Sequence, residues 1–309
     1  MKSLVTVAKL AALALPIVVL GCASAPQESD DTTASADQIV GGTADRGHTY
    51  VVAVGDANGA FCTGTVISRR VVVTAGHCFG GITRVFFGSS AFRPTRAINV
   101  VSEIRHPGYN DTTLANDLTV LQLASDALVQ PAPLLRETLK NTADFIGPSF
   151  TFVGYGLSNG RTQSGFGTKR VVQIPIAAVG PARVGGTAGT LDATQFYYRT
   201  PGKNTCNGDS GGPAFVVRKG VETHAGVTSF GDATCVADGV QQRTDLPAIT
   251  SFIQPLIDRF EGGNACRSDG TCNESCNTGG QVMDPDCHVN HCAADGICSR
   301  ACTADPDCR

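Results

Sequence analysis

Three short motifs, far apart along the chain, constrain the fold of this sequence more than any other feature. They read Thr74-Ala75-Gly76-His77-Cys78, Asn116-Asp117-Leu118 and Gly208-Asp209-Ser210-Gly211-Gly212-Pro213. A serine hydroxyl is a weak nucleophile unless a histidine takes its proton and a carboxylate orients that histidine. The sequence therefore predicts a fold in which His77, Asp117 and Ser210 converge from three distant segments on one cleft.

Each of these three residues alone has a structural explanation, as a core histidine, a turn aspartate and a serine in a glycine-rich turn. Their joint occurrence, with a cysteine beside His77 and glycines around Ser210, favours nucleophilic catalysis instead. His48, His106 and His224 lack such surroundings and are assigned no role.

The local sequence pattern of the central region predicts an all-β fold. Short apolar runs are bounded by Gly, Asn or Asp, and the expected strands include 71–73, 84–87, 118–123 and 214–217. One helix is expected from Pro247 to Phe260, where apolar residues recur every three or four positions, and Pro255 is expected to interrupt it. A chain of 309 residues is long enough for two small barrels and further segments.

From residue 39 to about residue 262, the chain resembles the trypsin- and chymotrypsin-like serine endopeptidases. Ile39-Val40-Gly41-Gly42 matches the mature amino terminus of that family, Val153-Gly154-Tyr155-Gly156 resembles its Gly-Trp-Gly strand, and Ser229-Phe230-Gly231 resembles its Ser-Trp-Gly segment. The resemblance implies two six-stranded antiparallel β-barrels of the chymotrypsin type with a C-terminal helix, followed here by a small disulfide-rich tail. It also implies protein or peptide substrates, no cofactor and no metal.

The resemblance assigns the catalytic roles residue by residue. Ser210 would attack the substrate carbonyl through its hydroxyl, and His77 would act first as general base and then as general acid. Asp117 would orient His77. The backbone N–H groups of Gly208 and Ser210 would form the oxyanion hole that stabilises the charge on the substrate oxygen.

The resemblance also locates the primary substrate pocket, with Asn204 at its floor and Ser229, Phe230, Gly231 and Gly239 along its walls. Family members that cut after Lys or Arg carry Asp at the position of Asn204, and a neutral amide cannot compensate a buried cation. A large uncharged residue before the cleaved bond (P1) is therefore expected rather than a basic one. Asn204 could hydrogen-bond a Gln side chain, and Gln241, where the family often has Tyr, adds a polar group of unassigned direction.

Residues 23–38 are rich in Ser, Thr, Ala and Asp without apolar periodicity, as expected of a propeptide or linker. The resemblance implies a zymogen cut before Ile39, whose new α-ammonium would pair with Asp209 and order the pocket. Gln38 stands before the cut instead of the Lys or Arg common in the family, so tryptic self-activation is not expected. Recognition of Gln by Asn204 would make Gln38 a self-recognised site.

Residues 1–22 read as an export signal, in which Lys2 and Lys9 flank an apolar stretch shorter than a typical membrane span. Val19-Leu20-Gly21-Cys22 resembles a bacterial lipobox, which would lipidate Cys22, and an ordinary signal peptide is the alternative. The protein is therefore expected to be exported, as a secreted protein or as a periplasmic or outer-membrane lipoprotein of a bacterium. A cut before Ile39 would release the enzyme from a lipid on Cys22.

The chain contains 13 cysteines, and setting Cys22 aside leaves an even number that suits disulfides in an oxidising compartment. The family pattern pairs Cys62 with Cys78 and Cys206 with Cys235. The other eight lie in the tail, residues 263–309, which contains two repeats with Asp-Gly before the second Cys and Asp-Pro-Asp-Cys at the end.

The Cys-rich tail carries seven acidic residues against three basic ones. Zinc binding by its cysteines and calcium binding by its aspartates are minor alternatives to a disulfide-stapled, solvated surface. The composition favours attachment to an unknown surface or protein ligand over chemistry.

Two other function classes stay open. A catalytically inactive protease-fold protein that binds or adheres through the Cys-rich tail would be marked by a lost catalytic residue, and His77, Asp117 and Ser210 are all present. An esterase would use the same chemistry on another acyl group. With a formal net charge of −3, no nucleic-acid partner is expected.

Overall fold

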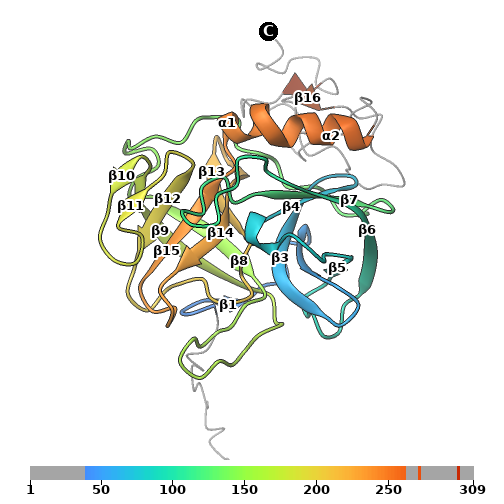
Figure 1. Cartoon of the computed structure of the whole chain (residues 1–309), viewed down its shortest axis with the longest axis horizontal. Helices are drawn as coiled ribbons and strands as arrows, with labels where there is room; N and C mark the ends of the chain where they lie inside the picture. Colours follow the sequence, from blue (N-terminus) through green and yellow to red (C-terminus); the bar gives the residue numbers. More distant parts are fainter. Residues whose placement is uncertain (1–38, 262–270, 273–297, 300–309) are drawn as a thin grey trace, which may run out of the picture. The chain divides into compact units, whose positions relative to one another are not determined.

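The computed structural model describes residues 39–261, 271–272 and 298–299 (Figure 1). The expected export signal with Cys22, the expected propeptide and nearly all of the Cys-rich tail lie outside the described residues. In the tail, only β16 (Thr271–Cys272) and β17 (Cys298–Ser299) are described, and they pair in parallel.

The first barrel contains six antiparallel strands, closed in the order β2-β3-β4-β7-β6-β5. They are β2 (Val51–Gly55), β3 (Ala60–Ser68), β4 (Val71–Thr74), β5 (Arg84–Phe87), β6 (Arg96–Arg105) and β7 (Thr119–Leu123). Alternating side chains point inward, and the β-branched and leucine residues among them form one buried cluster that includes Val52, Val66, Val72, Val85, Ile98 and Leu121. Three of the strands expected from the sequence are thus confirmed.

The second barrel is built from β8 (Ser149–Gly154), β9 (Arg170–Val179), β12 (Gln195–Arg199), β13 (Pro213–Arg218), β14 (Val221–Gly231) and β15 (Asp238–Arg243). They are hydrogen-bonded in the order β9-β12-β15-β14-β13-β8, and pairing of β8 with β9 closes the ring. The short β1 (Thr43–Ala44) adds to the edge of β9, and β10 (Ala182–Arg183) pairs with β11 (Thr190–Leu191). The expected architecture of two six-stranded antiparallel barrels is confirmed.

A helical segment follows the second barrel and packs on the first (Figure 1). It runs as α1 (Leu246–Ala248), a π-helical turn (Ile249–Ile253) and α2 (Gln254–Glu261). The expected interruption at Pro255 is wrong, because the wider π-helical turn directly before it accommodates a residue that lacks an N–H and crowds the preceding turn. No helix among the described residues has the length and apolar character needed to span a membrane.

Tyr155 connects the two barrels. It follows β8 of the second barrel and is almost fully buried. Its hydroxyl lies 3.1 Å from the carbonyl oxygen of Val51 in the first barrel and within hydrogen-bond distance of the Gly88 carbonyl. The ring that replaces the family's Trp is therefore packed and hydrogen-bonded at the boundary between the barrels.

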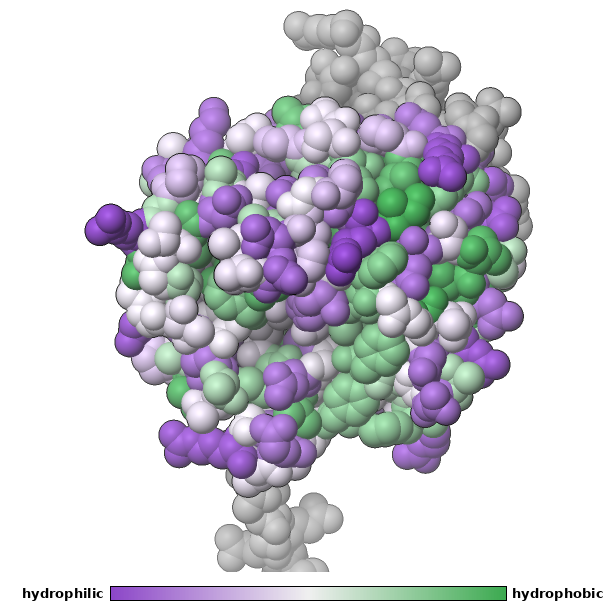
Figure 2. Space-filling model, viewed as in Figure 1, coloured by the Kyte–Doolittle hydropathy of each residue, from purple (hydrophilic) through white to green (hydrophobic). Residues whose placement is uncertain are grey.

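On the face shown in Figure 2, apolar residues gather mainly over the first barrel, at the right of the view. Most of the exposed large apolar side chains of the described chain belong to this half, and they include Phe61, Phe79, Phe92, Val101 and Leu128. Phe61 and Phe79 directly flank the cysteines Cys62 and Cys78. An apolar surface therefore borders the segment that carries His77.

Candidate active site

His77 and Asp117 form a pair held by two hydrogen bonds. His77 lies on a short 3₁₀ turn, Gly76–Cys78, after β4, and Asp117 lies just before β7, the neighbour of β4. His77 Nδ1 is 2.8 Å from Asp117 Oδ2, and the His77 backbone N–H donates to Asp117 Oδ1 at 2.8 Å. A carboxylate can only accept here, so Nδ1 carries the hydrogen and Nε2 is the ring nitrogen left to take a proton.

The Asp117 carboxylate is completely buried and has further support from the second barrel. Ser229 Oγ donates to Asp117 Oδ2, and the Asp117 backbone N–H donates to Gln242 Oε1 at 3.0 Å. A side chain at Gly76 would come within 2.9 Å of the Leu118 nitrogen, so glycine is needed for this close approach. The pair is therefore fixed by both barrels.

The segment around Ser210 is seated against the end of β4 that leads to His77. The Ser210 carbonyl accepts from the Thr63 N–H at 2.8 Å, and Cys78 Sγ lies 3.8 Å from the same oxygen. A Cβ on Gly211, which has φ +79°, would overlap Thr74 Oγ1 and lie 2.6 Å from the Ala75 nitrogen. The three predicted residues are therefore brought together, although within residues 39–261 no hydrogen bond joins Ser210 Oγ to His77.

The backbone N–H groups of Gly208 and Ser210 have no acceptor in the described part of the chain, whereas their neighbours are bonded. The Asp209 N–H donates to the Cys206 carbonyl at 2.9 Å, and the Gly211 N–H donates to the Thr228 carbonyl at 2.8 Å. Gly208 has φ +95°, a conformation that favours glycine, and a Cβ there would lie 2.6 Å from the Phe166 ring. Two N–H donors thus flank Asp209 without an internal partner.

Asp209 is completely buried. Its carboxylate accepts from the Gly156 N–H at 2.7 Å and from the Cys206 N–H at 2.8 Å. Burial raises the pKa of Asp209 to about 7, against the lowering effect of these N–H donors. A Cβ on Gly154 would overlap the carboxylate and one on Gly156 would lie 2.5 Å from its Cγ, which explains the glycines around Tyr155.

Ile39 is completely buried, in the cluster that also holds Phe150 and Phe152 of the second barrel. It has φ +21°, and its carbonyl accepts from the Gly42 N–H at 2.6 Å. The next carbonyl, of Val40, accepts from the Asn204 N–H at 3.1 Å. The segment after the expected cut therefore contacts the segment that carries the expected pocket floor.

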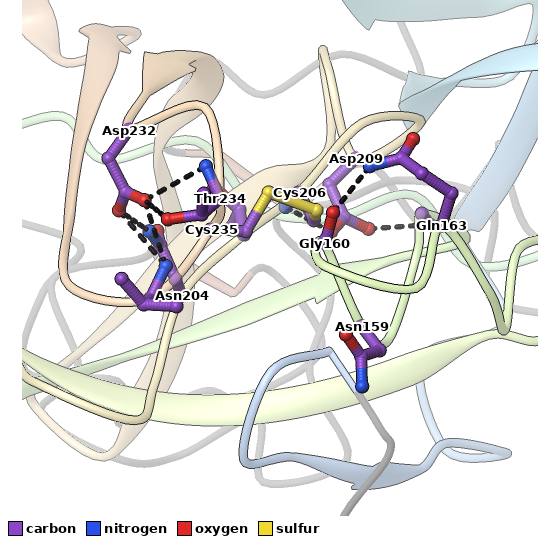
Figure 3. The surroundings of a disulfide bond; sticks show 12 residues. Asn159, Gly160, Gln163, Asn204, Cys206, Asp209, Asp232, Thr234 and Cys235 are labelled. Carbon is purple, nitrogen blue, oxygen red and sulfur yellow. Dashed lines mark hydrogen bonds between the residues drawn. A yellow bond between two sulfur atoms is a disulfide. The ribbon is translucent and has the colours of Figure 1, made fainter.

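Asn204 is completely buried, and its amide nitrogen lies beside the Asp232 carboxylate (Figure 3). Its Oδ1 accepts from the Tyr198 hydroxyl. Its Nδ2 donates to Asp232 Oδ2 at 2.8 Å and to the Asp238 carbonyl at 3.0 Å. Both N–H donors of Asn204 already have internal acceptors, so its recognition of a substrate Gln stays a prediction that would depend on the second lone pair of Oδ1.

Asp232 organises the loop beside this floor. Its carboxylate accepts from the backbone N–H of Val236 at 3.0 Å and of Ala237 at 2.9 Å, and from Thr234 Oγ1 at 2.9 Å. Burial acts to raise the pKa of Asp232, but the N–H groups of Ala237 and Val236 and the Thr234 hydroxyl outweigh it and lower the pKa to about 2. Asp232 is therefore ionised at neutral pH, next to an uncharged Asn204.

The expected pocket walls are the ends of two paired strands. Phe230 lies opposite Val240, and Gly231 lies opposite Gly239. A Cβ on Gly231 would lie 2.7 Å from the Asp238 carbonyl, and one on Gly239 would overlap the Tyr198 hydroxyl. The Ser229 hydroxyl donates to Asp117 Oδ2, and the contact of Ser229 with substrate stays a prediction.

Two disulfides brace the site. Cys62–Cys78 joins β3 to the turn that carries His77, and Cys206–Cys235 joins the Ser210 segment to the Asp232 loop (Figure 3). Disulfides of this kind are typical of extracellular proteins. Among the described residues, no group of three or more His, Cys, Asp or Glu side chains could hold a metal ion.

The sequence reasoning missed Gln242 and Asp232, which contact Asp117 and Asn204. Neither residue stands in a recognisable motif. The position of Gln242, directly before Arg243 at the end of β15, gives no signal until the pairing of β14 with β15 is known. The Gln242 contact arises from strand register and the Asp232 contact from the loop after β14, and the local sequence specifies neither.

Two closed antiparallel barrels, with a histidine–aspartate pair and a serine at their boundary, define a chymotrypsin-fold serine endopeptidase. Residues 39–250 match the family model described as Trypsin, and the chain belongs to that family.

Similar proteins include trypsin epsilon of Drosophila erecta, 30% identical over 216 residues that cover 65% of this chain and 82% of that protein. Kallikrein-7 of Homo sapiens is 29% identical over 230 residues, which cover 72% and 88% of the two chains. Brachyurin of Leptuca pugilator is 31% identical over 202 residues, which cover 63% and 86%.

Proposed function

We propose that this serine endopeptidase hydrolyses peptide bonds through an acyl-enzyme formed on Ser210. His77 removes the proton from the Ser210 hydroxyl through Nε2 and later gives it to the leaving amine, while Asp117 fixes the ring orientation and stabilises its charged form. The observation that carries the proposal is the pair of 2.8 Å hydrogen bonds between Asp117 and His77. The close packing of Gly211 against Thr74 and Ala75 supports the role of Ser210.

The oxyanion of the intermediate is bound by the N–H groups of Gly208 and Ser210. The support for this role is that both donors lack an internal acceptor in the described chain, so they are free to bond a substrate oxygen. Removal of one such donor in a related hydrolase costs about 2.7–4 kcal/mol of transition-state stabilisation.

The chain is made as an exported zymogen with a signal at 1–22, a propeptide at 23–38 and a cut before Ile39. The α-ammonium of Ile39 pairs with Asp209, whose buried carboxylate has two N–H donors but needs a cation to be ionised at low cost. A lipid on Cys22 tethers the precursor to a bacterial membrane until the cut, and the Cys-rich tail binds a surface or protein ligand.

P1 residues are large and uncharged rather than basic. The support is that the pocket floor, Asn204, is neutral and that the acceptors of Asp232 are occupied by at least four donors, so a Lys or Arg side chain finds no free carboxylate. A catalytically inactive binding protein is not favoured, because the Asp117–His77 geometry is intact.

The test uses the full-length chain with residues 34–38 replaced by Asp-Asp-Asp-Asp-Lys, so that added enteropeptidase cuts before Ile39. The cut protein should hydrolyse a peptide library and release fragments with a consistent P1 class. Ser210→Ala should lose at least about 1,000-fold in kcat, because the nucleophile and its partners act as a unit. Hydrolysis that persists unchanged in Ser210→Ala would contradict the proposal.

A further inference from the structure

Gln241, in β15, is completely buried, yet neither polar atom of its amide has a hydrogen-bond partner among the described residues. Other buried amides of this barrel are bonded: Gln195, Gln242 and Asn204 each use both their oxygen and their nitrogen. An unsatisfied buried donor or acceptor costs about 1–3 kcal/mol. Because the unsatisfied amide destabilises the folded state, its presence indicates a role other than stabilising the fold.

The direction of the Gln241 side chain follows from strand alternation. Gln241 lies opposite Phe196 in the β12–β15 ladder, and Val240 lies opposite Tyr197. Val240 and Tyr197 pack together on one face of the sheet, whereas Phe196 and Tyr198 belong to the barrel interior. Because successive side chains alternate, Gln241 points to the interior side with Phe196 and Tyr198.

This interior side is where the floor of the expected pocket lies. The Tyr198 hydroxyl donates to Asn204 Oδ1, and a Cβ on Gly239 would overlap that hydroxyl. Gln241 lies two residues after Gly239 in β15, so the two residues face the same side of the sheet. The unpartnered amide therefore lies on the same face of β15 as the expected wall residue Gly239, on the side of the sheet where Tyr198 contacts the expected floor, Asn204.

We propose that the Gln241 amide binds the P1 side chain, and that the preferred P1 residue carries a carboxamide, as Gln does. The proposal rests on the endopeptidase function proposed above. Gln241 Nε2 donates to the carboxamide oxygen of the substrate, and Gln241 Oε1 accepts from its N–H. An apolar P1 residue leaves both atoms unsatisfied, and a Lys or Arg brings a charge that the amide cannot neutralise.

The same preference applies to the chain's own activation site. The residue before Ile39 is Gln38, so the expected cut follows a carboxamide side chain. A mature molecule therefore cuts other precursor molecules, and activation is autocatalytic between molecules. Asn204, whose two N–H donors are engaged by Asp232 and Asp238, supports the pocket floor.

The test compares peptides that differ only at P1, with Gln, Met or Lys, using the enteropeptidase-activated chain described above. Met is close to Gln in size and shape but has no amide. The parent protein should cleave after Gln with a kcat/KM at least about tenfold higher than after Met. Gln241→Met should abolish this preference by lowering kcat/KM for P1 Gln relative to P1 Met.

Gln173→Met is the matched control, because Gln173 is an exposed amide in β9 of the same barrel. It should change neither the P1 preference nor the unfolding temperature, whereas Gln241→Met should raise the unfolding temperature by removing an unsatisfied buried amide. Equal cleavage after Gln and Met by the parent, or an unchanged preference in Gln241→Met, overturns the proposal. Failure of the parent and both variants on every peptide instead overturns the endopeptidase function.

The activation step has its own measurement. A Ser210→Ala precursor with its natural residues 34–38 cannot cut itself, so any new amino terminus comes from added mature protein. Amino-terminal sequencing should find Ile39 after incubation with the parent and much less with Gln241→Met. Cleavage of Gln38→Lys as fast as the natural precursor would contradict recognition of Gln38.

Discussion

At the scale of the single residue, the Asp232 carboxylate should limit how far the substitution Asn204→Asp shifts cleavage toward basic P1 residues. By family resemblance, Asn204→Asp should direct the pocket to basic P1 residues. Its new oxygen would replace an N–H donor that lies 2.8 Å from Asp232 Oδ2 and 3.0 Å from the Asp238 carbonyl. Two carboxylates at this separation share a proton rather than both ionise.

We therefore expect Asn204→Asp alone to gain little cleavage after Lys or Arg. The double variant Asn204→Asp/Asp232→Asn restores one carboxylate beside one amide and should exceed the single variant at least about tenfold in kcat/KM for P1 Lys. Calorimetric binding of benzamidine, an arginine-like cation, to both variants in a Ser210→Ala background gives a readout without catalysis. Equal gains in the two variants would show that Asp232 has no influence.

The motif residues could be predicted because each motif is short and chemically specific: His77, Asp117 and Ser210 all lie at the boundary between the barrels. The partners of these residues could not. Asp232 and Gln242 reach Asn204 and Asp117 through loop conformation and strand register.

At the scale of the structural element, a charged histidine fastens the segment after β1 to the second barrel. His48 Nδ1 lies 2.9 Å from Asp45 Oδ1 in the same segment, and His48 Nε2 lies 3.0 Å from Glu222 Oε2 in β14. The His48 ring stacks on Phe215 with centroids 5.6 Å apart, and the Tyr50 hydroxyl donates to the same Glu222 oxygen. Two carboxylates thus hold one imidazolium between them.

The stabilisation from His48 should depend on pH. Burial opposes the charge on His48, but the hydrogen bonds with Asp45 and Glu222 prevail and raise its pKa from 6.5 to about 9. The contribution is therefore complete below pH 6.5, the unfolded value, and is lost as pH rises through about 9. His48→Gln should lower the free energy of unfolding by about 1–3 kcal/mol near pH 6 in urea titrations, with the difference vanishing near pH 10. A difference that does not change with pH would contradict this assignment.

The helical segment illustrates the limit of prediction at this scale. The recurrence of apolar residues gave its position closely, since Ile249, Phe252 and Ile257 pack on the first barrel as expected. The uninterrupted passage through Pro255 could not be foreseen, because the π-helical turn that allows it depends on tertiary packing rather than on a sequence signal.

At the scale of the whole molecule, the burial of the Asp209 carboxylate should make the free energy of unfolding depend on the expected cleavage before Ile39. In the uncut chain, burial raises the pKa of this carboxyl group from 3.8 to about 7. The folded state therefore binds a proton that the unfolded state releases, and stability falls as pH rises from 3.8 through about 7. A cation supplied by the new amino terminus of Ile39 would remove this loss.

The cut protein should therefore unfold at a higher temperature than the precursor, by a margin that grows as pH rises through about 7. Differential scanning calorimetry at several pH values measures this margin. Asp209→Asn serves as the control, since without the carboxylate the margin should disappear. A margin that is constant with pH would exclude Asp209 as its source.

The barrel architecture could be predicted because the family motifs span most of the two barrels and short alternating strands agree with them. The roles of residues 1–38 and of the Cys-rich tail stay predictions. The composition of these segments indicates their type, such as a linker or a disulfide-rich module. It does not define a packed core, so it does not specify which residues are in contact.

The complete burial of Ile39 in a chain that has not been cut has a kinetic consequence. A protease binds several residues on both sides of the cleaved bond in extended conformation. Cleavage before Ile39 therefore requires the Ile39 side chain to leave its buried cluster. Under the activation proposed above, the precursor stays inactive as long as the Ile39 side chain stays in this cluster. The rate of the proposed activation then depends on how often the segment at Ile39 unfolds locally. It should increase with temperature well below the unfolding temperature of either barrel.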